Sequence, residues 1–409
     1  MNFPYKTIND VNVRDKQVLL RADYNVPQND DGTISDDYRV EASLPTIKFL
    51  LERGAKIVVI SHLGRPKGER NEKYTLAPVA ARLSEKLGQE VKFIGDCVGD
   101  AVSVATKKMS AGEIVMLENL RFYAAEEEND RDFAADLAKS SNAGLFVQDG
   151  FGVVHRAHAS TSAITEFLPS VAGFLLEREY VEIKSAVDDP NRPLTAMMGG
   201  AKVSDKILLV EKFIDIADNV IIGGAMANNF LKFYGHNVAS SLVEPDIDET
   251  VKRILDHAHA KFGDKFDERF QIPVDVAISA SGDLDGRRTE IGVEELANIP
   301  SDAKILDIGG QSIDRAVETI EQSGTVIWNG TLGYAEKPEF SHGSARIAMA
   351  MAKNTHITSI IGGGDTADFV RGWDALNGGS FTHVSTGGGA SLELMAGDTL
   401  PGIAALMAK

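Results

Sequence analysis

The sequence predicts an α/β protein with two Rossmann-like domains, each a mostly parallel sheet with helices on both faces, joined by a helix. The chain has 409 residues, more than the roughly 250 to 300 over which one hydrophobic core usually grows. Short apolar runs alternate with longer amphipathic segments, which is typical of buried parallel strands and crossover helices. A break rich in proline and aspartate near the middle separates the two halves.

The strands are predicted from unbroken Val-, Ile- and Leu-rich runs. Runs without polar alternation are typical of strands that are buried on both faces, so we expect all of them to be parallel. In chain order they are 18–20, 57–60, 114–117, 145–147, 196–198, 220–222, 305–308, 326–328, 360–361 and 381–384.

A helix is predicted to join the two halves. Leu176, Tyr180, Ile183 and Val187 recur at i, i+4, i+7 and i+11, which is the apolar stripe of an amphipathic helix over 174–187. The segment 188–193 that follows contains two prolines and cannot continue a helix or a central strand.

Composition and net charge indicate which kinds of molecule the protein binds. Apolar residues at 43% and charged residues at 25% are ordinary globular values. The net charge of −18 argues against nucleic acid as the main partner, because a phosphate-tracking surface needs an excess of Lys and Arg. A small anion remains possible where a few cations converge in a cleft.

The cellular setting is predicted from the cysteine count and the apolar runs. Cys97 is the only cysteine, so an internal disulfide and a multi-cysteine zinc site are excluded. The first ten residues lack the pattern of a signal peptide, and no apolar stretch approaches the ~20 residues that span a bilayer. We expect a cytoplasmic protein that does not bind membranes.

Polar and cationic side chains gather where the apolar runs of the first half end. Open α/β sheets bind ligands at the carboxyl ends of their strands, so a shared cationic crevice is expected there. Several arginines together favour a small multiply anionic ligand, because each guanidinium offers a planar fork to carboxylate or phosphate oxygens. The alternative is that each arginine pairs with one of the 60 acidic residues. The residues are Arg21, Asp23, Asn25, His62, Arg65, Arg121 and Arg156.

Other titratable residues near these segments have structural interpretations. His62 is either a base, a donor to an anion, or a histidine that shapes its loop. His155 and His158 flank Arg156 without a third ligand at metal spacing, so a structural role is favoured. The acidic run 126–128 is interpreted as carboxylates at a helix start, where they offset the positive end of the helix dipole.

In the second half, glycine-rich turns follow the apolar runs. Such turns present backbone N–H groups that suit polyphosphate. After Gly199 and Gly200, the chain is predicted to open a helix with Lys202 and Lys206 one turn apart on the same face. Two ammonium groups so placed repel each other unless an anion lies between them, which favours phosphate contacts.

Two further glycine turns carry the same signal. The segment 362–366 (GGGDT) supplies amides, a hydroxyl and a carboxylate for Mg²⁺, although close helix–strand packing would also demand glycine. Gly387, Gly388 and Gly389 are expected to open the last helix and offer another cluster of amide donors. Neither a P-loop nor a GxGxxG fingerprint occurs in the chain.

Taken together, five ordered segments resemble the signatures of phosphoglycerate kinases, from the first strand to the last helix. They are 21–27 (RADYNVP), 61–66 (SHLGRP), 199–206 (GGAKVSDK), 362–366 (GGGDT) and 385–391 (STGGGAS).

The resemblance implies a phosphoglycerate-binding domain over 1–170, an interdomain helix over 171–188, and a nucleotide-binding domain over 189–392. It also implies that the C-terminal segment, 393–409, returns to the first domain. The positions that match the family's acid-binding residues are Asp23, Asn25, Arg39, His62, Arg65, Arg121 and Arg156. The positions that match its nucleotide-binding residues are Lys202, Lys206, Asn329, Glu336, Gly363, Gly364, Asp365 and Thr366, with Asp365 on the metal.

The activity implied is reversible, Mg²⁺-dependent phosphoryl transfer in glycolysis between 1,3-bisphosphoglycerate with ADP and 3-phosphoglycerate with ATP. The acceptor carboxylate is ionised at neutral pH, so no general base is required and His62 becomes a positioning donor. Arg39, Lys202 and the amides of Gly387 and Gly388 would neutralise charge during in-line transfer, after the two domains close. The expected partners are these small molecules alone, with no nucleic acid or membrane, and the chain is expected to be a monomer.

The segment 329–336 departs from the family's usual wording, because NGTLGYAE stands where NGPMGVFE is more typical. The change bears on base selectivity and nucleotide affinity, while the phosphate-handling groups are kept. A non-catalytic relative that senses phospho-ligands is the second interpretation, and a nicotinamide-dependent dehydrogenase is a distant third. Retention of Arg39, Lys202, Lys206 and Asp365 together favours the enzyme.

Overall fold

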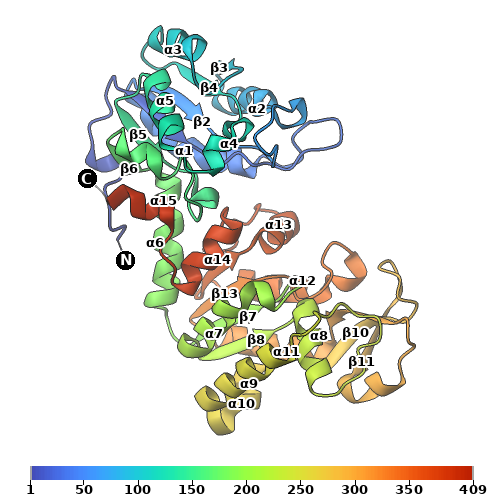
Figure 1. The fold of residues 1–409 in the computed structure, drawn as a ribbon. Helices are drawn as coiled ribbons and strands as arrows, with labels where there is room; N and C mark the ends of the chain where they lie inside the picture. The colour runs from blue at the N-terminus through green and yellow to red at the C-terminus, as the bar shows by residue number, and fades with distance from the viewer. Residues whose placement is uncertain (1, 408–409) are drawn as a thin grey trace. The chain divides into compact units, whose positions relative to one another are not determined.

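The computed structural model describes residues 2–407 and divides into two compact units. Unit 1 runs to Val181 and also contains the stretch that begins at Gly397, and unit 2 is Glu182–Ala396. Each unit has its own six-stranded sheet (Figure 1). Because every strand of both sheets runs parallel to its neighbours, the predicted α/β class is confirmed.

The sheet of unit 1 has the strand order β3-β4-β2-β1-β5-β6. The two strands that the sequence prediction missed, β3 and β6, lie at its two edges, where apolar runs are shorter and less continuous. The strands are β1 (Gln17–Arg21), β2 (Lys56–Ile60), β3 (Val91–Ile94), β4 (Ile114–Leu117), β5 (Leu145–Gln148) and β6 (Ser170–Ala172).

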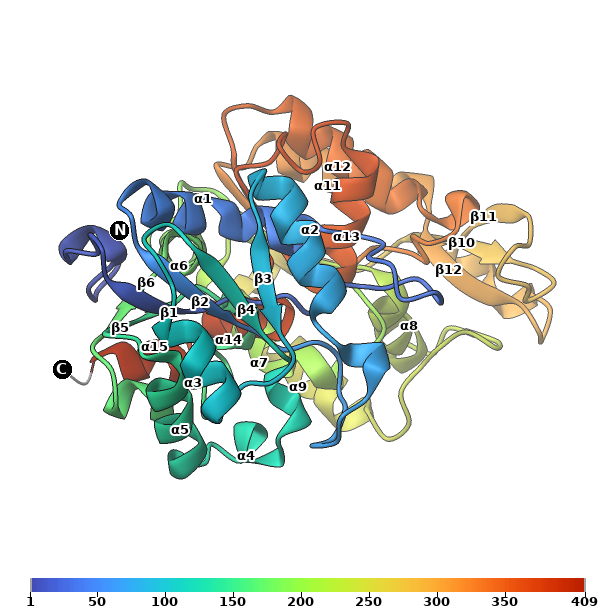
Figure 2. The same cartoon turned by 90° about the horizontal axis from the view of Figure 1, so that it is seen from above.

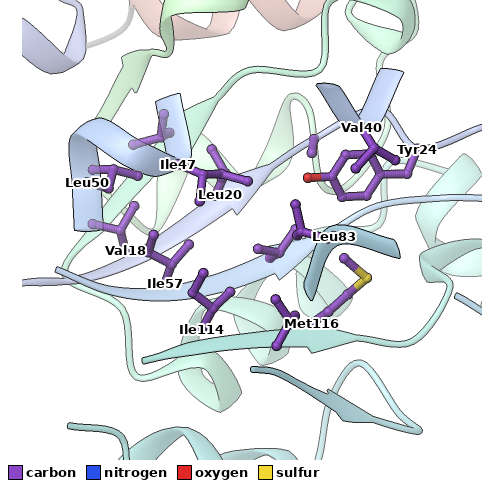
Figure 3. Packing of buried hydrophobic residues seen from close by; sticks show 14 of the residues in the cluster. Val18, Leu20, Tyr24, Val40, Ile47, Leu50, Ile57, Leu83, Ile114 and Met116 are labelled. Carbon is purple, nitrogen blue, oxygen red and sulfur yellow. The ribbon is translucent and has the colours of Figure 1, made fainter. Parts of the chain in front are cut away.

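Helices cover both faces of this sheet, as Figure 2 shows. Alternate strand residues point to opposite faces, so Leu20 and Ile57 pack against α1 and α2 whereas Leu19 and Val58 pack against α3 and α5. Figure 3 shows the first of these clusters, in which Ile47 and Leu50 of α1 lie over the strands. The helices are α1 (Tyr38–Glu52), α2 (Ala77–Leu87), α3 (Asp100–Lys107), α4 (Ala124–Glu127) and α5 (Arg131–Ser141).

The predicted joining helix is confirmed as α6 (Phe174–Asp188), which begins in unit 1 and ends in unit 2. Asp149, directly after β5, caps its start, since Oδ1 accepts hydrogen bonds from the backbone N–H of Leu175 (2.9 Å) and Leu176 (3.4 Å). These bonds satisfy amides that have no partner within the helix. Burial raises the pKa of Asp149 to about 6.

The C-terminal stretch packs within unit 1. Its short helix α15 (Pro401–Ala404) begins one residue before Gly402, whose N–H donates to the carbonyl oxygen of Val154 at 2.8 Å. A Cβ at Gly402 would lie 3.0 Å from the Val154 backbone and side chain, so a larger residue would push this contact apart. The helix that begins at Gly388 is therefore not the last one, contrary to the sequence expectation.

The main sheet of unit 2 has the strand order β15-β14-β13-β7-β8-β9. Its apolar runs are buried along their whole length in β7, β8 and β13, in agreement with the parallel strands predicted. The strands are β7 (Leu194–Met198), β8 (Asn219–Ile222), β9 (Phe270–Gln271), β13 (Thr325–Asn329), β14 (Thr358–Gly362) and β15 (His383–Val384).

A large cluster centred on Trp328 fills one side of this sheet, where α11, α12 and α13 contribute their apolar stripes. Trp328 is fully buried and its indole N–H donates to the carbonyl oxygen of Gly330 at 2.8 Å, which supports the turn after β13. The helices of unit 2 are α7 (Ile207–Ile216), α8 (Gly224–Phe233), α9 (Asp248–Phe262), α10 (Phe266–Arg269), α11 (Gly310–Glu321), α12 (His342–Lys353), α13 (Gly364–Trp373) and α14 (Gly388–Ala396).

The run 305–308 does not join the parallel sheet, so that part of the strand prediction is wrong. It lies in β12 (Lys304–Ile308), which pairs antiparallel with β10 (Asp275–Ser279), itself antiparallel to β11 (Arg288–Gly292). Ile305 packs with Val276 and Ile278 in a small separate cluster. A short apolar run predicts a buried strand but not the direction of its neighbour, because both arrangements bury the same side chains.

No helix within residues 2–407 is both long enough and apolar enough to span a lipid bilayer.

Candidate active site

The first group of predicted site residues lies where the central strands of unit 1 end. The strands β4, β2, β1 and β5 are adjacent and parallel, so the loops at their carboxyl ends meet at one edge. The N–H of Gly64, after β2, donates to Asn25 Oδ1, after β1, at 2.8 Å. Arg121 Nη1, after β4, donates to the carbonyl oxygen of Gly64 at 2.8 Å. Three loops are therefore tied together by predicted site residues.

Asp23 and Arg39 form an ion pair at this edge. The Asp23 carboxylate is buried, and the Arg39 side chain, on the first turn of α1, stays 28% exposed. Burial favours the neutral acid, but the Arg39 charge and the hydrogen bond from the Asn25 backbone N–H hold the pKa of Asp23 well below its usual range. A Cβ at Gly152 would lie 2.1 Å from Asp23 Oδ2, so only glycine fits beside this pair.

The four other arginines of the prediction have different surroundings. Arg121 is buried and its Nε lies 3.2 Å from Glu127 Oε1, so the alternative that each arginine pairs with an acidic residue holds for it, as it does for Arg39.

Arg65 is exposed and makes no hydrogen bond or ion pair with any residue from 2 to 407. Arg156 donates through Nε to His155 Nε2 at 3.2 Å and has no acidic partner in the described chain. Arg21 is fully buried, and its charge is not offered to solvent.

His62 is buried and neutral at neutral pH. Burial lowers its pKa well below the ordinary value, and the nearby guanidinium groups of Arg21 and Arg121 add to the shift although Asp23 opposes it. Its Nδ1 lies 3.1 Å from Arg21 Nη2.

Neither His155 nor His158 belongs to a metal cluster. Among residues 2–407, no group of three or more His, Cys, Asp or Glu side chains is arranged to hold an ion. Burial, with the charge of Arg121, lowers the pKa of His158 to about 3. His155 accepts the hydrogen bond from Arg156, so it positions that guanidinium.

The acidic run 126–128 was expected to place carboxylates at a helix start, and for Glu126 and Glu127 this is confirmed, but the burial of Glu126 was not foreseen. Glu126 does lie in the first turn of α4, but its side chain is fully buried, and Ser160 donates to it through both N–H (3.0 Å) and Oγ–H (2.6 Å). Sequence reasoning missed Ser160 altogether. The contact joins residues 34 positions apart, and nothing local in the sequence signals it.

In unit 2, a cavity of about 440 Å³ opens among the glycine-rich turns. Its size is within the range of small-molecule sites. Its wall includes Gly200 after β7, Gly224 at the start of α8, and Thr331 after β13. Apolar and aromatic side chains also line it, namely Leu242, Leu284, Ile305, Leu306 and Tyr334. Leu242 and Leu284 were not predicted to belong to the site, and Ile305 and Leu306 come from β12, so only the fold brings these residues together.

The turn at Gly199 and Gly200 does not offer its amides to a ligand, contrary to the sequence expectation. Gly199 N–H donates to the carbonyl oxygen of Asn329 and Gly200 N–H to that of Thr331, both at 2.9 Å. A Cβ at Gly199 would lie 2.2 Å from the Thr331 carbonyl oxygen. Glycine is therefore required here by the close approach of two backbone turns.

The expected pairing of Lys202 and Lys206 on one helical face is also wrong. The 3₁₀ turn Ser204–Lys206 precedes α7, so Lys202 lies before the helix, where it is exposed. Lys206 turns inward and donates through Nζ to the carbonyl oxygens of Gly199 (2.8 Å) and Asn329 (3.3 Å). Burial lowers the pKa of Lys206 to about 8. The chain turns at Gly200, with φ of +95°, which a helical prediction cannot foresee.

The segment 362–366 forms the start of a helix at the carboxyl end of β14. Gly363, with φ of +86°, precedes α13, so the amides of the helix's first turn have no partners within the helix. Thr366 Oγ1 accepts a hydrogen bond from Gly330 N–H at 2.7 Å. Asn329 lies beside Gly363, fully buried, and within the described chain neither its Oδ1 nor its Nδ2 has a hydrogen-bond partner. A buried side-chain amide without a hydrogen-bond partner, next to free backbone N–H groups at a helix start, is typical of a binding site for a polar ligand.

The two acidic residues of the predicted nucleotide site, Glu336 and Asp365, both line the cavity and are exposed. The third glycine turn differs from the expectation in part. Gly387 N–H donates to Ser385 Oγ at 3.1 Å, whereas α14 begins at Gly388 and leaves its first-turn amides without helical partners.

A mostly parallel α/β unit with an arginine-rich strand edge, and a second one with a glycine-lined cavity and open helix amides, are typical of two-unit α/β proteins that bind small phosphorylated molecules. The sequence profile of the family "Phosphoglycerate kinase" matches residues 8–398. The chain therefore belongs to the phosphoglycerate kinase family, as the resemblance of its five segments predicted, and it is a phosphotransferase.

Similar proteins match over nearly the full length. The chain is 46% identical over 404 residues to the phosphoglycerate kinase of Clostridioides difficile, and 43% identical over 401 residues to that of Desulforudis audaxviator, with 98% of each chain covered in both cases. Among solved structures, the phosphoglycerate kinase of Coxiella burnetii superposes with a TM-score of 0.84 at 34% identity, covering 99% of both chains. That of Pyrococcus horikoshii gives 0.82 at 32% identity, covering 98% of both chains.

Proposed function

We propose that the chain catalyses reversible, Mg²⁺-dependent phosphoryl transfer between 1,3-bisphosphoglycerate with ADP and 3-phosphoglycerate with ATP, in glycolysis. The observation that carries the proposal is that the two units present different kinds of polar group. Unit 1 presents arginines and a neutral histidine at its strand ends, whereas unit 2 presents a glycine-lined cavity of nucleotide size.

Unit 1 is proposed to bind the three-carbon acid. Arg65 and Arg156 have no carboxylate partners in the described chain, so their guanidinium forks can meet phosphate or carboxylate oxygens without first breaking an ion pair. Asp23 and Asn25 fix Arg39 and the Gly64 loop around them. The chemistry needs no general base, because the attacking carboxylate is already ionised.

Unit 2 is proposed to bind the nucleotide. The first-turn amides of α13, reached through Gly363, Gly364 and Thr366, are suited to phosphate oxygens. Asn329 would gain the hydrogen bonds that its buried amide lacks. Glu336 and the apolar side chains of the cavity wall would face the nucleoside.

The residues present fit a magnesium ion that arrives with the nucleotide. Mg²⁺ is usually held by one or two carboxylates together with phosphate oxygens and water, so a single exposed carboxylate beside the helix amides is sufficient. Asp365 is that carboxylate, in the first turn of α13. When bound, the ion would offset phosphate charge, and Asp365 would hold it at the cavity.

Charge neutralisation of the migrating phosphoryl group is assigned to Arg39, Lys202 and the amides at Gly388, with Gly387 fixing the turn before them. Lys202 is exposed and Arg39 is 28% exposed, whereas Arg21 is fully buried and Lys206 Nζ is bonded to two carbonyl oxygens. Positioning and electrostatic stabilisation supply most of the acceleration in phosphoryl transfer.

In-line transfer requires that the two ligand sets meet, so we propose closure of the units about α6, with the reaction shielded from water. Small-angle scattering tests this step. Addition of 3-phosphoglycerate and a non-hydrolysable ATP analogue together should reduce the radius of gyration, whereas either ligand alone should reduce it less. An unchanged radius with both ligands would contradict closure.

We propose four functional segments with the boundaries 1–170, 171–188, 189–392 and 393–409. We also propose that the active protein is a monomer in the cytoplasm. Size-exclusion chromatography with light scattering measures the oligomeric state directly.

The decisive test is an assay for 1,3-bisphosphoglycerate formation from ATP and 3-phosphoglycerate by the purified chain. Turnover is expected with Mg²⁺, and its removal by chelation should abolish it. Ligand binding without turnover would instead support a non-catalytic sensor of phospho-ligands.

A further inference from the structure

A fully buried polar network of unit 1 lies beside the candidate site and is not explained by ligand binding. Arg21, at the end of β1, and Glu126, in α4, are both fully buried. Their closest charged atoms, Arg21 Nη2 and Glu126 Oε1, are 4.0 Å apart. Burying two charges costs several kcal/mol each, so a network of this kind calls for a reason beyond stability.

All the donors of Arg21 that have partners point into the protein. Its Nε donates to Ser160 Oγ at 2.8 Å, Nη1 donates to the carbonyl oxygen of Ala22, and Nη2 donates to His62 Nδ1 at 3.1 Å. The hydrogen bonds that the Arg21 guanidinium makes therefore all go to protein groups within unit 1. Arg21 differs in this from Arg65, which is exposed.

Ser160 connects Arg21 to Glu126. Its Oγ accepts from Arg21 Nε and donates to Glu126 Oε1 at 2.6 Å, while its N–H donates to Glu126 Oε2 at 3.0 Å. Both oxygens of Glu126 are thereby held, and the carboxylate fixes the hydroxyl that orients Arg21. His158 Nδ1 lies 3.8 Å from the same carboxylate oxygen.

The consequence for His62 follows from donor and acceptor chemistry. An arginine guanidinium can only donate, so His62 Nδ1 must accept the hydrogen bond from Arg21. Burial keeps the imidazole ring neutral, because it lowers the pKa of His62 well below the ordinary value. A neutral ring that accepts at Nδ1 carries its proton at Nε2. Nε2 has no hydrogen-bond partner among residues 2–407.

We propose that Arg21, oriented by Ser160 and Glu126, is a positioning residue that fixes His62 as the Nε2–H tautomer, and so as a hydrogen-bond donor to the anionic acid substrate. Arg21 itself does not touch the substrate. The inference deepens the proposed function, because it rests on the assignment of the acid to unit 1.

The first measurement is the tautomer of His62, without any ligand. Protonated and unprotonated ring nitrogens of a neutral imidazole resonate in well-separated ¹⁵N ranges, and the His62→Gln spectrum assigns the His62 signals among the nine histidines. The wild-type chain should show a single Nε2–H form. The double variant Arg21→Met/Glu126→Gln, which leaves no unpaired buried charge, should show a mixture of tautomers. Should this variant fail to fold, Ser160→Ala tests the same step more mildly.

The second measurement is the KM for 3-phosphoglycerate. Loss of one well-oriented hydrogen bond to a charged ligand should raise it about 10-fold in Arg21→Met/Glu126→Gln, with a smaller change in kcat. In a His62→Gln background, whose amide supplies a donor in place of Nε2–H, the same double variant should add less than about 2-fold. A matched control is Arg288→Met/Asp307→Asn, which removes a buried pair (2.8 Å) in unit 2 and should alter neither readout.

A single Nε2–H form of His62 in Arg21→Met/Glu126→Gln, or in Ser160→Ala if that variant replaces it, overturns the proposal. So does an undiminished rise in KM in the His62→Gln background, since Arg21 would then act independently of His62. Failure of the site assignment gives a different result. His62→Gln by itself would leave the KM for 3-phosphoglycerate unchanged, although the tautomer still depended on Arg21.

Discussion

The two candidate sites offer different kinds of group to an anion. Unit 1 uses long cationic side chains, of which Arg39 is held by Asp23 and Arg121 by Gly64 and Glu127, whereas Arg65 has no such partner among residues 2–407. Unit 2 uses mainly backbone, with glycines at Gly199, Gly224 and Gly363 where turns approach closely or φ is positive.

This difference has a physical basis. A side chain must lose rotamer freedom to bind in one geometry, and in unit 1 the partners of Arg39 and Arg121 order these two side chains in advance. A helix N-terminus has its amides already fixed, so unit 2 needs few side chains, but at Gly199 and Gly224 a Cβ would collide with backbone. Substitutions in unit 1 should therefore affect chemistry and substrate binding, whereas substitutions at the turns of unit 2 should affect the fold of the site itself.

The largest effect is expected from Gly199→Ala. The new Cβ would lie 2.2 Å from the Thr331 carbonyl oxygen and 2.6 Å from that of Gly330, and neither is the end of a flexible side chain. We expect unit 2 to lose on the order of 4 kcal/mol of stability, with nucleotide binding abolished. Thermal unfolding and calorimetric titration with ADP measure both.

The control is Gly372→Ala, in α13, where a Cβ meets nothing within 4 Å. It should be neutral, or stabilising by up to about 1 kcal/mol, because alanine is the better helix former. Equal damage from the two substitutions would show that backbone contact is not what requires glycine at 199.

The next effect compares one cation from each unit. Arg39→Ala and Lys202→Ala should each lower kcat by about 10²-fold, the scale for loss of a preorganised electrostatic contact. Only Arg39→Ala also leaves a buried carboxylate, Asp23, without its cation. Steady-state kinetics with denaturant unfolding separates the two. Full activity of Lys202→Ala would remove that residue from the transfer step.

Lys206 is the exception in unit 2, because it is a partly buried cationic side chain in a site made mainly of backbone, and it predicts a pH dependence. Burial lowers its folded-state pKa to about 8 from an ordinary 10.5, so the unfolded chain binds more protons between these values. Stability should therefore rise as pH increases from 8 to 10.5, by up to about 3 kcal/mol. Lys206→Met should lack this rise. Parallel pH profiles of the two proteins, from denaturant unfolding monitored at Trp328, would contradict the assignment.

The smallest effect is expected at the exposed rim of the cavity. Glu336→Ala should raise the KM for the nucleotide about 5-fold, since one solvent-accessible hydrogen bond is lost, with kcat nearly unchanged. Initial rates at varied ATP concentration measure it. A large fall in kcat would move Glu336 from binding to the transfer step.

Much of the fold was predictable because parallel strands buried on both faces leave a local record. The apolar runs of β1, β2, β7, β13 and β14 follow that rule, and the 3.6-residue stripe of α6 gave its bounds to within one residue. The direction of β12 was predicted wrongly, since an apolar run of four residues cannot show whether the neighbouring strand is parallel or antiparallel. The edge strands β3 and β6 escaped it because they are less continuously apolar.

The candidate site was predictable in its ingredients but not in its arrangement. Residue type and position after a strand marked Arg65, Asn329 and Asp365, and the structure brings the last of these to the cavity wall. The sequence pattern did not reveal that Lys206 turns inward and donates to two carbonyl oxygens, or that the amides of Gly199 and Gly200 are already hydrogen-bonded. Those facts depend on how closely two turns pack.

The hydrophobic pattern, the glycine turns and the cations that follow strands can be read from short stretches of the chain, because periodicity and conformational preference are local properties. Which of those cations are exposed and which are buried depends on tertiary contacts. Arg21 meets Ser160 across 139 positions and Lys206 meets Asn329 across 123. Burial and hydrogen bonding are fixed by such distant contacts, which no stretch of sequence contains.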